Sequence, residues 1–155
     1  MPEPSLNQLI LNLAAASVMV ALTTLSHLVG LLTLSRLVGD AHARFSLHRG
    51  RLRRFGAVLL TVFGVFGLHT LQIWSYAVLY RVLGELQTFE QSLYFSTVTF
   101  VGLGYGDVVL TPRWRVLSAI EAANGVILIA WSTAFLLAVT TRLKLFAHKW
   151  LDLDA

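Results

Sequence analysis

Residues 94–107 read Tyr-Phe-Ser-Thr-Val-Thr-Phe-Val-Gly-Leu-Gly-Tyr-Gly-Asp, and this stretch decides how the rest of the chain is interpreted. It lies between two long apolar segments and places Gly102, Gly104 and Gly106 at alternate positions. Glycine weakens a helix, and irregular backbone at membrane depth is tolerated only where it is buried in protein or lines a water-filled cavity. A helix-packing face would need small residues four apart rather than two. The stretch is therefore a candidate pore lining.

The composition is that of a membrane protein of single-domain length. The chain has 155 residues, of which 56% are hydrophobic and 13% are charged, and its mean hydropathy is +0.71. Residues 9–34, 55–83 and 116–141 each reach the roughly 20 apolar residues that a membrane-crossing helix needs. Residues 89–101 are too short to cross and predict a re-entrant helix. We expect an all-α membrane protein with three transmembrane helices and this re-entrant helix.

The distribution of arginine and lysine predicts the orientation. Basic residues crowd the connection between the first two spans and follow the last one: Arg36, Arg44, Arg49, Arg51, Arg53, Arg54, Arg142, Lys144 and Lys149. Because loops rich in these residues stay cytoplasmic, we expect the amino terminus outside a cell (inner) membrane and the carboxyl terminus inside. Residues 1–8 contain no Lys or Arg, so the first span reads as a retained helix rather than a signal peptide.

The residue content argues against an enzyme. The chain has no cysteine, which excludes disulfides and thiolate metal sites. No group of His, Asp and Glu has the spacing of a metal site, and no nucleophile, base and orienting residue form a set. We therefore expect no catalytic residue and no cofactor.

The stretch resembles the pore module of the potassium-channel superfamily, specifically its bacterial two-helix channel group. The family pattern opens its pore helix with aromatic-Phe-Ser, matched at residues 94–96, and ends in Gly-Tyr-Gly-Asp, matched at residues 104–107. The resemblance implies a pore domain in residues 55–145. An extra transmembrane helix and a basic connection precede it in residues 1–54, and a short cytoplasmic tail follows in residues 146–155.

The resemblance also implies a homotetramer, in which main-chain carbonyls replace the hydration shell of a permeant potassium ion. The ion-binding filter residues would be Gly102, Leu103, Gly104, Tyr105 and Gly106. Thr99, Asp107 and Glu121 would support the filter and its outer mouth. Gly125 would be a gating hinge, with a tight packing contact as the alternative. Gly104 and Gly106 are expected at positive φ, which turns successive carbonyls toward the axis.

Two residues depart from the family pattern. Val101 and Gly102 stand where the family has two threonines, the second of which supplies a carbonyl and a hydroxyl to the innermost ion site. Gly102 keeps the carbonyl and lacks the hydroxyl, so ion selectivity is less determined than the fold. The leading hypothesis is a channel for K⁺. The alternatives are a weakly selective channel that also passes Na⁺ or Ca²⁺, and a non-conducting membrane scaffold of the same fold.

Glu121 lies inside a predicted span, where an unpaired carboxylate is costly. One interpretation places it behind the filter as a hydrogen-bond partner of Thr97, Thr99 or the loop near Arg113. The other places it at the outer interface, in contact with water.

Other polar and aromatic residues in the spans have structural interpretations. His27, His69 and Gln72 are expected to form hydrogen bonds between helices. An interfacial aromatic belt is expected near the outer surface, formed by Trp74, Tyr76, Tyr80 and Trp114.

The basic connection, residues 35–54, has two interpretations. It either anchors the cytoplasmic side or lies on the inner leaflet as an amphipathic stretch. In the second case anionic lipid would bind the arginines Arg49, Arg51, Arg53 and Arg54. We favour anchoring because that rule is general. The first helix is expected to pack on the outside of the pore domain.

Overall fold

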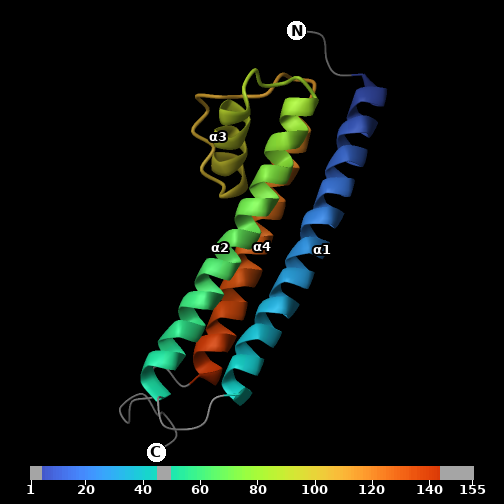
Figure 1. Cartoon of the computed structure of the whole chain (residues 1–155). Coiled ribbons are helices and arrows are strands. Elements are labelled where there is room, and N and C mark those ends of the chain that lie inside the picture. The colour runs from blue at the N-terminus through green and yellow to red at the C-terminus, as the bar shows by residue number, and fades with distance from the viewer. Residues whose placement is uncertain (1–4, 45–49, 144–155) are drawn as a thin grey trace, which may run out of the picture.

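The protein is described here from a computed structural model that covers residues 5–44 and 50–143. These residues form four helices, α1 (Leu6–Arg44), α2 (Gly50–Val82), α3 (Phe89–Phe100) and α4 (Arg115–Arg142). The three long helices run side by side, and the short α3 lies beside α2 at the end where α1 begins (Figure 1). The described residues contain no strand. The predicted all-α architecture is confirmed.

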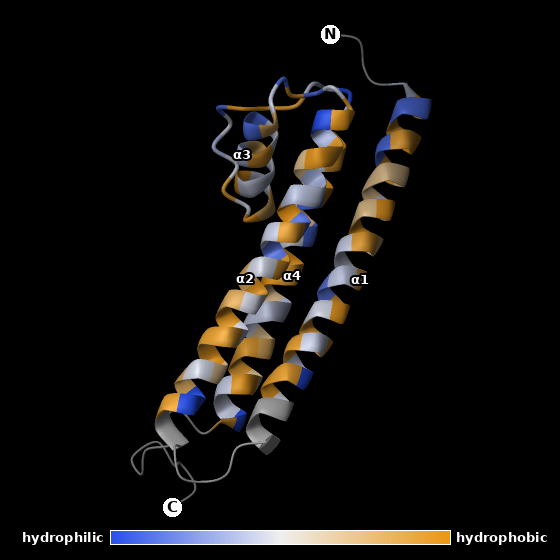
Figure 2. Cartoon of the chain, in the orientation of Figure 1, coloured by the Kyte–Doolittle hydropathy of each residue, from blue (hydrophilic) through white to orange (hydrophobic). Residues whose placement is uncertain are grey.

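Three of the helices are suited to crossing a membrane. The segments Leu6–Gly39, Leu52–Val82 and Arg115–Arg142 have the necessary length and hydropathy. Apolar residues occupy most of their length (Figure 2), and large side chains such as Phe63 and Phe66 are exposed. The 12 residues of α3 extend only about 18 Å at 1.5 Å per residue, which is too short to cross. The chain is therefore a multi-pass membrane protein with one half-length helix.

The connection between α1 and α2 is shorter than predicted. α1 continues to Arg44 and α2 already begins at Gly50, so most of residues 35–54 extends the two long helices. Arg49 and the tail residues 146–155 lie outside the described residues, and only the backbone of Arg51 is described. Binding of anionic lipid by the four arginines stays a prediction, and the structure describes the side chains of two of them, Arg53 and Arg54.

α3 begins and ends close to its predicted bounds because local signals define them. At its start the Thr88 hydroxyl accepts a hydrogen bond from the Gln91 amide at 3.1 Å, and Glu90 in the first turn complements the positive helix end. The face that α3 turns to α2 and α4 is buried. Hydrogen bonds between the two loops that flank α3 add to this support. The Glu85 carboxylate accepts from the amide and the hydroxyl of Thr111 at 2.8 and 2.9 Å.

α1 packs against α2 and α4, and among the described residues it makes no contact with α3. Its buried residues recur every three or four positions along one face: Asn12, Ala16, Met19, Thr23, His27, Leu31, Leu34 and Val38. Near the start of α1, the Asn12 side chain donates to the Arg113 carbonyl at 2.6 Å and accepts from the Leu117 amide at 3.3 Å. Because Trp114 gives α4 no side-chain cap, Asn12 supplies the cap from a neighbouring helix.

The predicted aromatic belt is wrong for three of its four members. Tyr76 and Tyr80 are fully buried, and Trp114 is 7% exposed. The tyrosine hydroxyls have partners on α4: the Tyr76 oxygen accepts from the Asn124 amide, and the Tyr80 hydroxyl donates to Glu121. These partners draw both rings into the interior. Only Trp74 is half-exposed, as an interfacial residue would be.

Asn12→Ala should destabilise the protein because it removes the α4 cap and leaves the Leu117 amide without that acceptor. We expect a loss of about 1 to 2 kcal/mol, the usual range for a lost cap. Thermal unfolding in detergent would measure it. Asn7→Ala on the exposed side of the same helix is the matched control. Equal melting temperatures for the two variants would refute the capping role.

Candidate functional site

The glycine segment, Gly102–Gly106, leaves α3 in an alternating backbone conformation. Gly102, Gly104 and Gly106 have φ values of 78°, 53° and 79°. Positive φ is accessible to glycine and strained for residues with a Cβ. Glycine therefore stands at each of the three positions where the backbone has a positive φ. The alternation was expected at Gly104 and Gly106, and the structure extends it to Gly102.

The amides at the start of this segment are bound to the carboxyl end of α3. The amides of Leu103 and Gly104 both donate to the Val98 carbonyl, at 2.9 and 3.1 Å, and the Gly102 amide donates to the Thr99 carbonyl at 2.9 Å. Within the described part of the chain no group donates to a carbonyl of residues 102–106, and all five residues are exposed in the single chain. The segment therefore keeps its carbonyls available for an external ligand.

Asp107 ends the segment and is held by α3. The Tyr94 hydroxyl donates to its carboxylate at 2.7 Å. This hydrogen bond lowers the pKa of Asp107 and raises the pKa of Tyr94, because it stabilises the carboxylate and the phenol together. Asp107 therefore stays ionised further into acid than a free carboxyl group, and it places a negative charge beyond Gly106.

Glu121 is fully buried behind α3, not at a water interface. Its carboxylate accepts hydrogen bonds from the Tyr80 hydroxyl at 2.5 Å and from the Ser96 hydroxyl at 2.6 Å. The predicted partners Thr97, Thr99 and the Arg113 loop are wrong, because the Thr97 hydroxyl donates back to Leu93 and Glu121 faces Ser96 instead. Ser96 belongs to the aromatic-Phe-Ser pattern at residues 94–96, which does not by itself predict this contact. The carboxylate of α4 thus joins this helix to α2 and α3.

Gly125 lets α3 approach α4 closely. A Cβ at this position would overlap the Phe100 carbonyl oxygen and would lie 2.8 Å from its carbon. Phe100 is fully buried and is the last residue of α3. The structure therefore gives Gly125 the tight packing contact that was one of its two interpretations. The hinge role stays a prediction, since α4 is a continuous helix through this residue.

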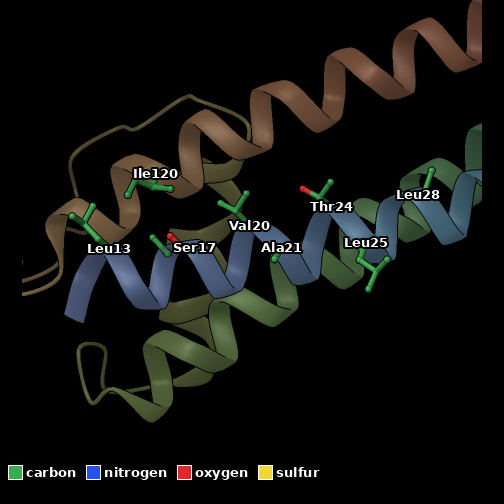
Figure 3. Close-up of a pocket in the computed structure, with 9 residues that line it drawn as sticks. Leu13, Ser17, Val20, Ala21, Thr24, Leu25, Leu28 and Ile120 are labelled. Carbon is green, nitrogen blue, oxygen red and sulfur yellow. The ribbon is translucent and has the colours of Figure 1, made fainter. Parts of the chain in front are cut away.

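A separate groove runs along α1, away from the glycine segment. It has a volume of about 550 Å³, and its side chains come from α1 except for Ile120 of α4 (Figure 3). Ser17 and Thr24 are its only polar side chains. It offers apolar contact and no set of ion ligands. Among the described residues, no group of three His, Cys, Asp or Glu could hold a metal ion.

Comparison with known families shows the family of this chain. A family model described as "Ion channel" matches residues 57–142, which is more than half of the chain. The chain belongs to this ion-channel family. Comparison with curated proteins and with solved structures gave no match.

The match assigns the ion-channel module to a particular part of the fold. Residues 57–142 take in nearly all of α2, all of α3 and the glycine segment, and α4. They lie within the pore domain predicted at residues 55–145. α1 lies outside the match, although it shares buried contacts with two of the matched helices. Membership also favours transport over enzymatic activity as the role of this site.

Glu121→Leu should destabilise the channel by about 1 to 3 kcal/mol, because it leaves the buried Tyr80 hydroxyl without an acceptor. Ser96 is affected less, since its hydroxyl also lies 2.9 Å from the Ile73 carbonyl. Glu121→Gln retains an acceptor for Tyr80 and should lose less. Thermal unfolding in detergent compares the two, with Gln91→Leu on the exposed side of α3 as the control. Equal stability of Glu121→Leu and Glu121→Gln would contradict this arrangement.

Proposed function

We propose that this ion channel is a homotetramer that conducts cations, with K⁺ as its main ion, through a filter formed by the carbonyls of residues 102–106. The observation that carries the proposal is the alternating positive φ of three glycines, together with amides bound to α3 and carbonyls to which no described residue donates. Rings of backbone carbonyls are the established means of replacing an ion's hydration shell. We expect the amino terminus outside and the carboxyl terminus in the cytoplasm.

The electrostatics of the segment favour a cation. The aligned peptide dipoles of α3 give its carboxyl end a partial negative charge, and Asp107 carries a full one at the other end of the segment. Asp107 would draw cations to the outer mouth, and Thr99 and Glu121 would support the filter from behind. An anion would meet negative charge at both ends.

Exposed apolar side chains next to the filter support assembly into a tetramer. Leu103, Tyr105 and Val109 are 57%, 67% and 69% exposed in the single chain. One chain provides only one set of carbonyls and cannot surround an ion. Three further copies would complete the carbonyl rings and would cover these side chains, whose exposure to water beside a pore is unfavourable.

A weakly selective cation channel is the second candidate, and Gly102 favours it. This residue has no hydroxyl to offer the innermost ion site, and a Cβ there would meet only Val126, at 3.5 Å. The innermost site would then hold its ion through carbonyls alone. Na⁺ or Ca²⁺ would pass more readily if this site were loose, because selectivity depends on the number of ligands and on filter rigidity.

Liposome flux tests conduction and its dependence on the glycine backbone. Purified protein should carry K⁺ down a gradient, with less Na⁺ flux, and Gly104→Ala should abolish it because alanine is strained at a φ of 53°. Gly67→Ala in α2 is the matched control, since neither position has an atom within 4 Å of the added Cβ. Silence of the wild type under every gradient would favour a scaffold, and full flux through Gly104→Ala would refute the carbonyl filter.

Gly102→Thr tests the missing hydroxyl. It should raise the ratio of K⁺ to Na⁺ permeability relative to Gly102→Ala, because both variants add a Cβ at a φ of 78° and only threonine adds an oxygen ligand. Reversal potentials in mixed K⁺ and Na⁺ measure the ratio. Equal ratios in the two variants would mean that the hydroxyl does not determine selectivity here.

A further inference from the structure

Four polar side chains from three helices form a closed hydrogen-bonded ring in the interior. Gln72 Nε2 lies 3.1 Å from His27 Nδ1, and His27 Nε2 lies 3.4 Å from Ser132 Oγ. Ser132 Oγ lies 2.9 Å from His69 Nε2, and His69 Nδ1 lies 3.0 Å from Gln72 Oε1. His27, Gln72 and Ser132 are at most 5% exposed. The ring joins α1, α2 and α4 at one level of the membrane.

The direction of every hydrogen bond in the ring is determined by Gln72. Its Nε2 also lies 3.3 Å from the Thr23 carbonyl, which can only accept, so the amide nitrogen must face Thr23 and His27. His27 Nδ1 then accepts, and its Nε2 donates to Ser132. Ser132 donates to His69 Nε2, and His69 Nδ1 donates to Gln72 Oε1. Each group donates and accepts once around the ring only if both imidazoles are neutral and in opposite tautomers.

The ring adjoins the point where α3 ends and the filter begins. The His69 ring lies 5.8 Å from the Phe100 ring, centroid to centroid. The Phe100 carbonyl sits on Gly125, two helical turns before Ser132 on α4. Phe100 also directly follows Val98 and Thr99, whose carbonyls hold the filter amides. A shift of His69 would therefore move the residue from which the filter departs.

We propose that His27, Gln72, His69 and Ser132 are positioning residues for the filter, so that α1 takes part in ion selection although it lies outside the matched channel module. The proposal rests on the proposed cation channel. It assigns α1 a role that packing alone would not require: His27 closes the ring and thereby holds His69 against Phe100. Removing His27 should loosen the filter's attachment to α3.

The ring also makes the filter sensitive to protons. A second proton on His27 Nδ1 would face the Gln72 amide group and break that hydrogen bond. A second proton on His69 Nε2 would reverse its bond with the Ser132 hydroxyl, which would then accept from both histidines and leave its own proton without an acceptor in the ring. Among the described residues, the titratable groups near either histidine of the ring are the other histidine and Tyr76. Tyr76 is linked to Thr23 through Asn124. Glu121 binds Tyr80 and Ser96 instead. The residue of α3 that lies against the histidines is Phe100, which contacts His69.

Two measurements test the ring without requiring that the protein conduct ions. Nitrogen-15 NMR of histidine-labelled protein, with the other three histidines changed to glutamine (His42, His48 and His148), should show one neutral ring protonated on Nε2 and one on Nδ1. Two identical tautomers would overturn the ring. Hydrogen exchange of the amides of residues 102–104 should accelerate about threefold to tenfold in His27→Leu and stay unchanged in Val29→Ala, an exposed neighbour on α1. Unchanged exchange in His27→Leu would overturn the positioning role.

Reversal potentials test the consequence for selectivity. The K⁺ to Na⁺ permeability ratio should fall about threefold to tenfold in His27→Leu, whereas His27→Gln, which can still donate and accept, should retain it. Below about pH 6, under the ordinary range of a free histidine, the wild-type ratio should fall, and the double variant His27→Gln with His69→Gln should lose this dependence. If the wild-type protein carried no ion flux, only the proposed function would be contradicted, because the NMR and hydrogen-exchange measurements do not depend on conduction. Flux with an unaltered ratio in His27→Leu would overturn this inference.

Discussion

The structure depends on one constraint, which is that backbone without helical hydrogen bonds must find partners where water is scarce. The chain meets it at the carboxyl end of α3. The carbonyls of Val98 and Thr99, which the end of a helix leaves free, accept the amides of residues 102–104. The first three amides of the segment are thereby satisfied from within, while no described residue donates to its carbonyls. This asymmetry between bound amides and available carbonyls is what a cation-binding backbone requires.

A half-length helix can present such a segment only if it is held on several sides. α3 is attached to α2 and α4 through Ser96 and Glu121, to α4 through Phe100 on Gly125, and to the segment itself through Tyr94 and Asp107. Each attachment uses a polar group or a glycine where a larger apolar residue would be the ordinary choice. Directional contacts of this kind define the position of a short helix better than apolar packing, which tolerates sliding.

α1 is attached to the matched channel module by hydrogen bonds as well as by apolar packing. Polar side chains reach α4 at three levels: Asn12 at its start, Thr23 through Asn124, and His27 through Ser132. In an apolar surrounding, helices without such bonds associate by close packing alone. The three levels fix the rotation and the register of α1 against α4, so the two helices are expected to move together.

The sequence by itself determined the number of membrane spans, the bounds of α3 and the positive φ of Gly104 and Gly106. These features are local, since run length, the Thr88 cap and the absence of a Cβ act over a few neighbouring residues. Only the tertiary structure decided the partners of Glu121, the burial of Tyr76 and Tyr80, and the ring through His27. Those contacts join residues 25 to 105 positions apart, and they depend on how each helix is rotated about its axis. The pattern of an almost uniformly apolar helix does not reveal that rotation, because lipid and protein interior select the same side chains.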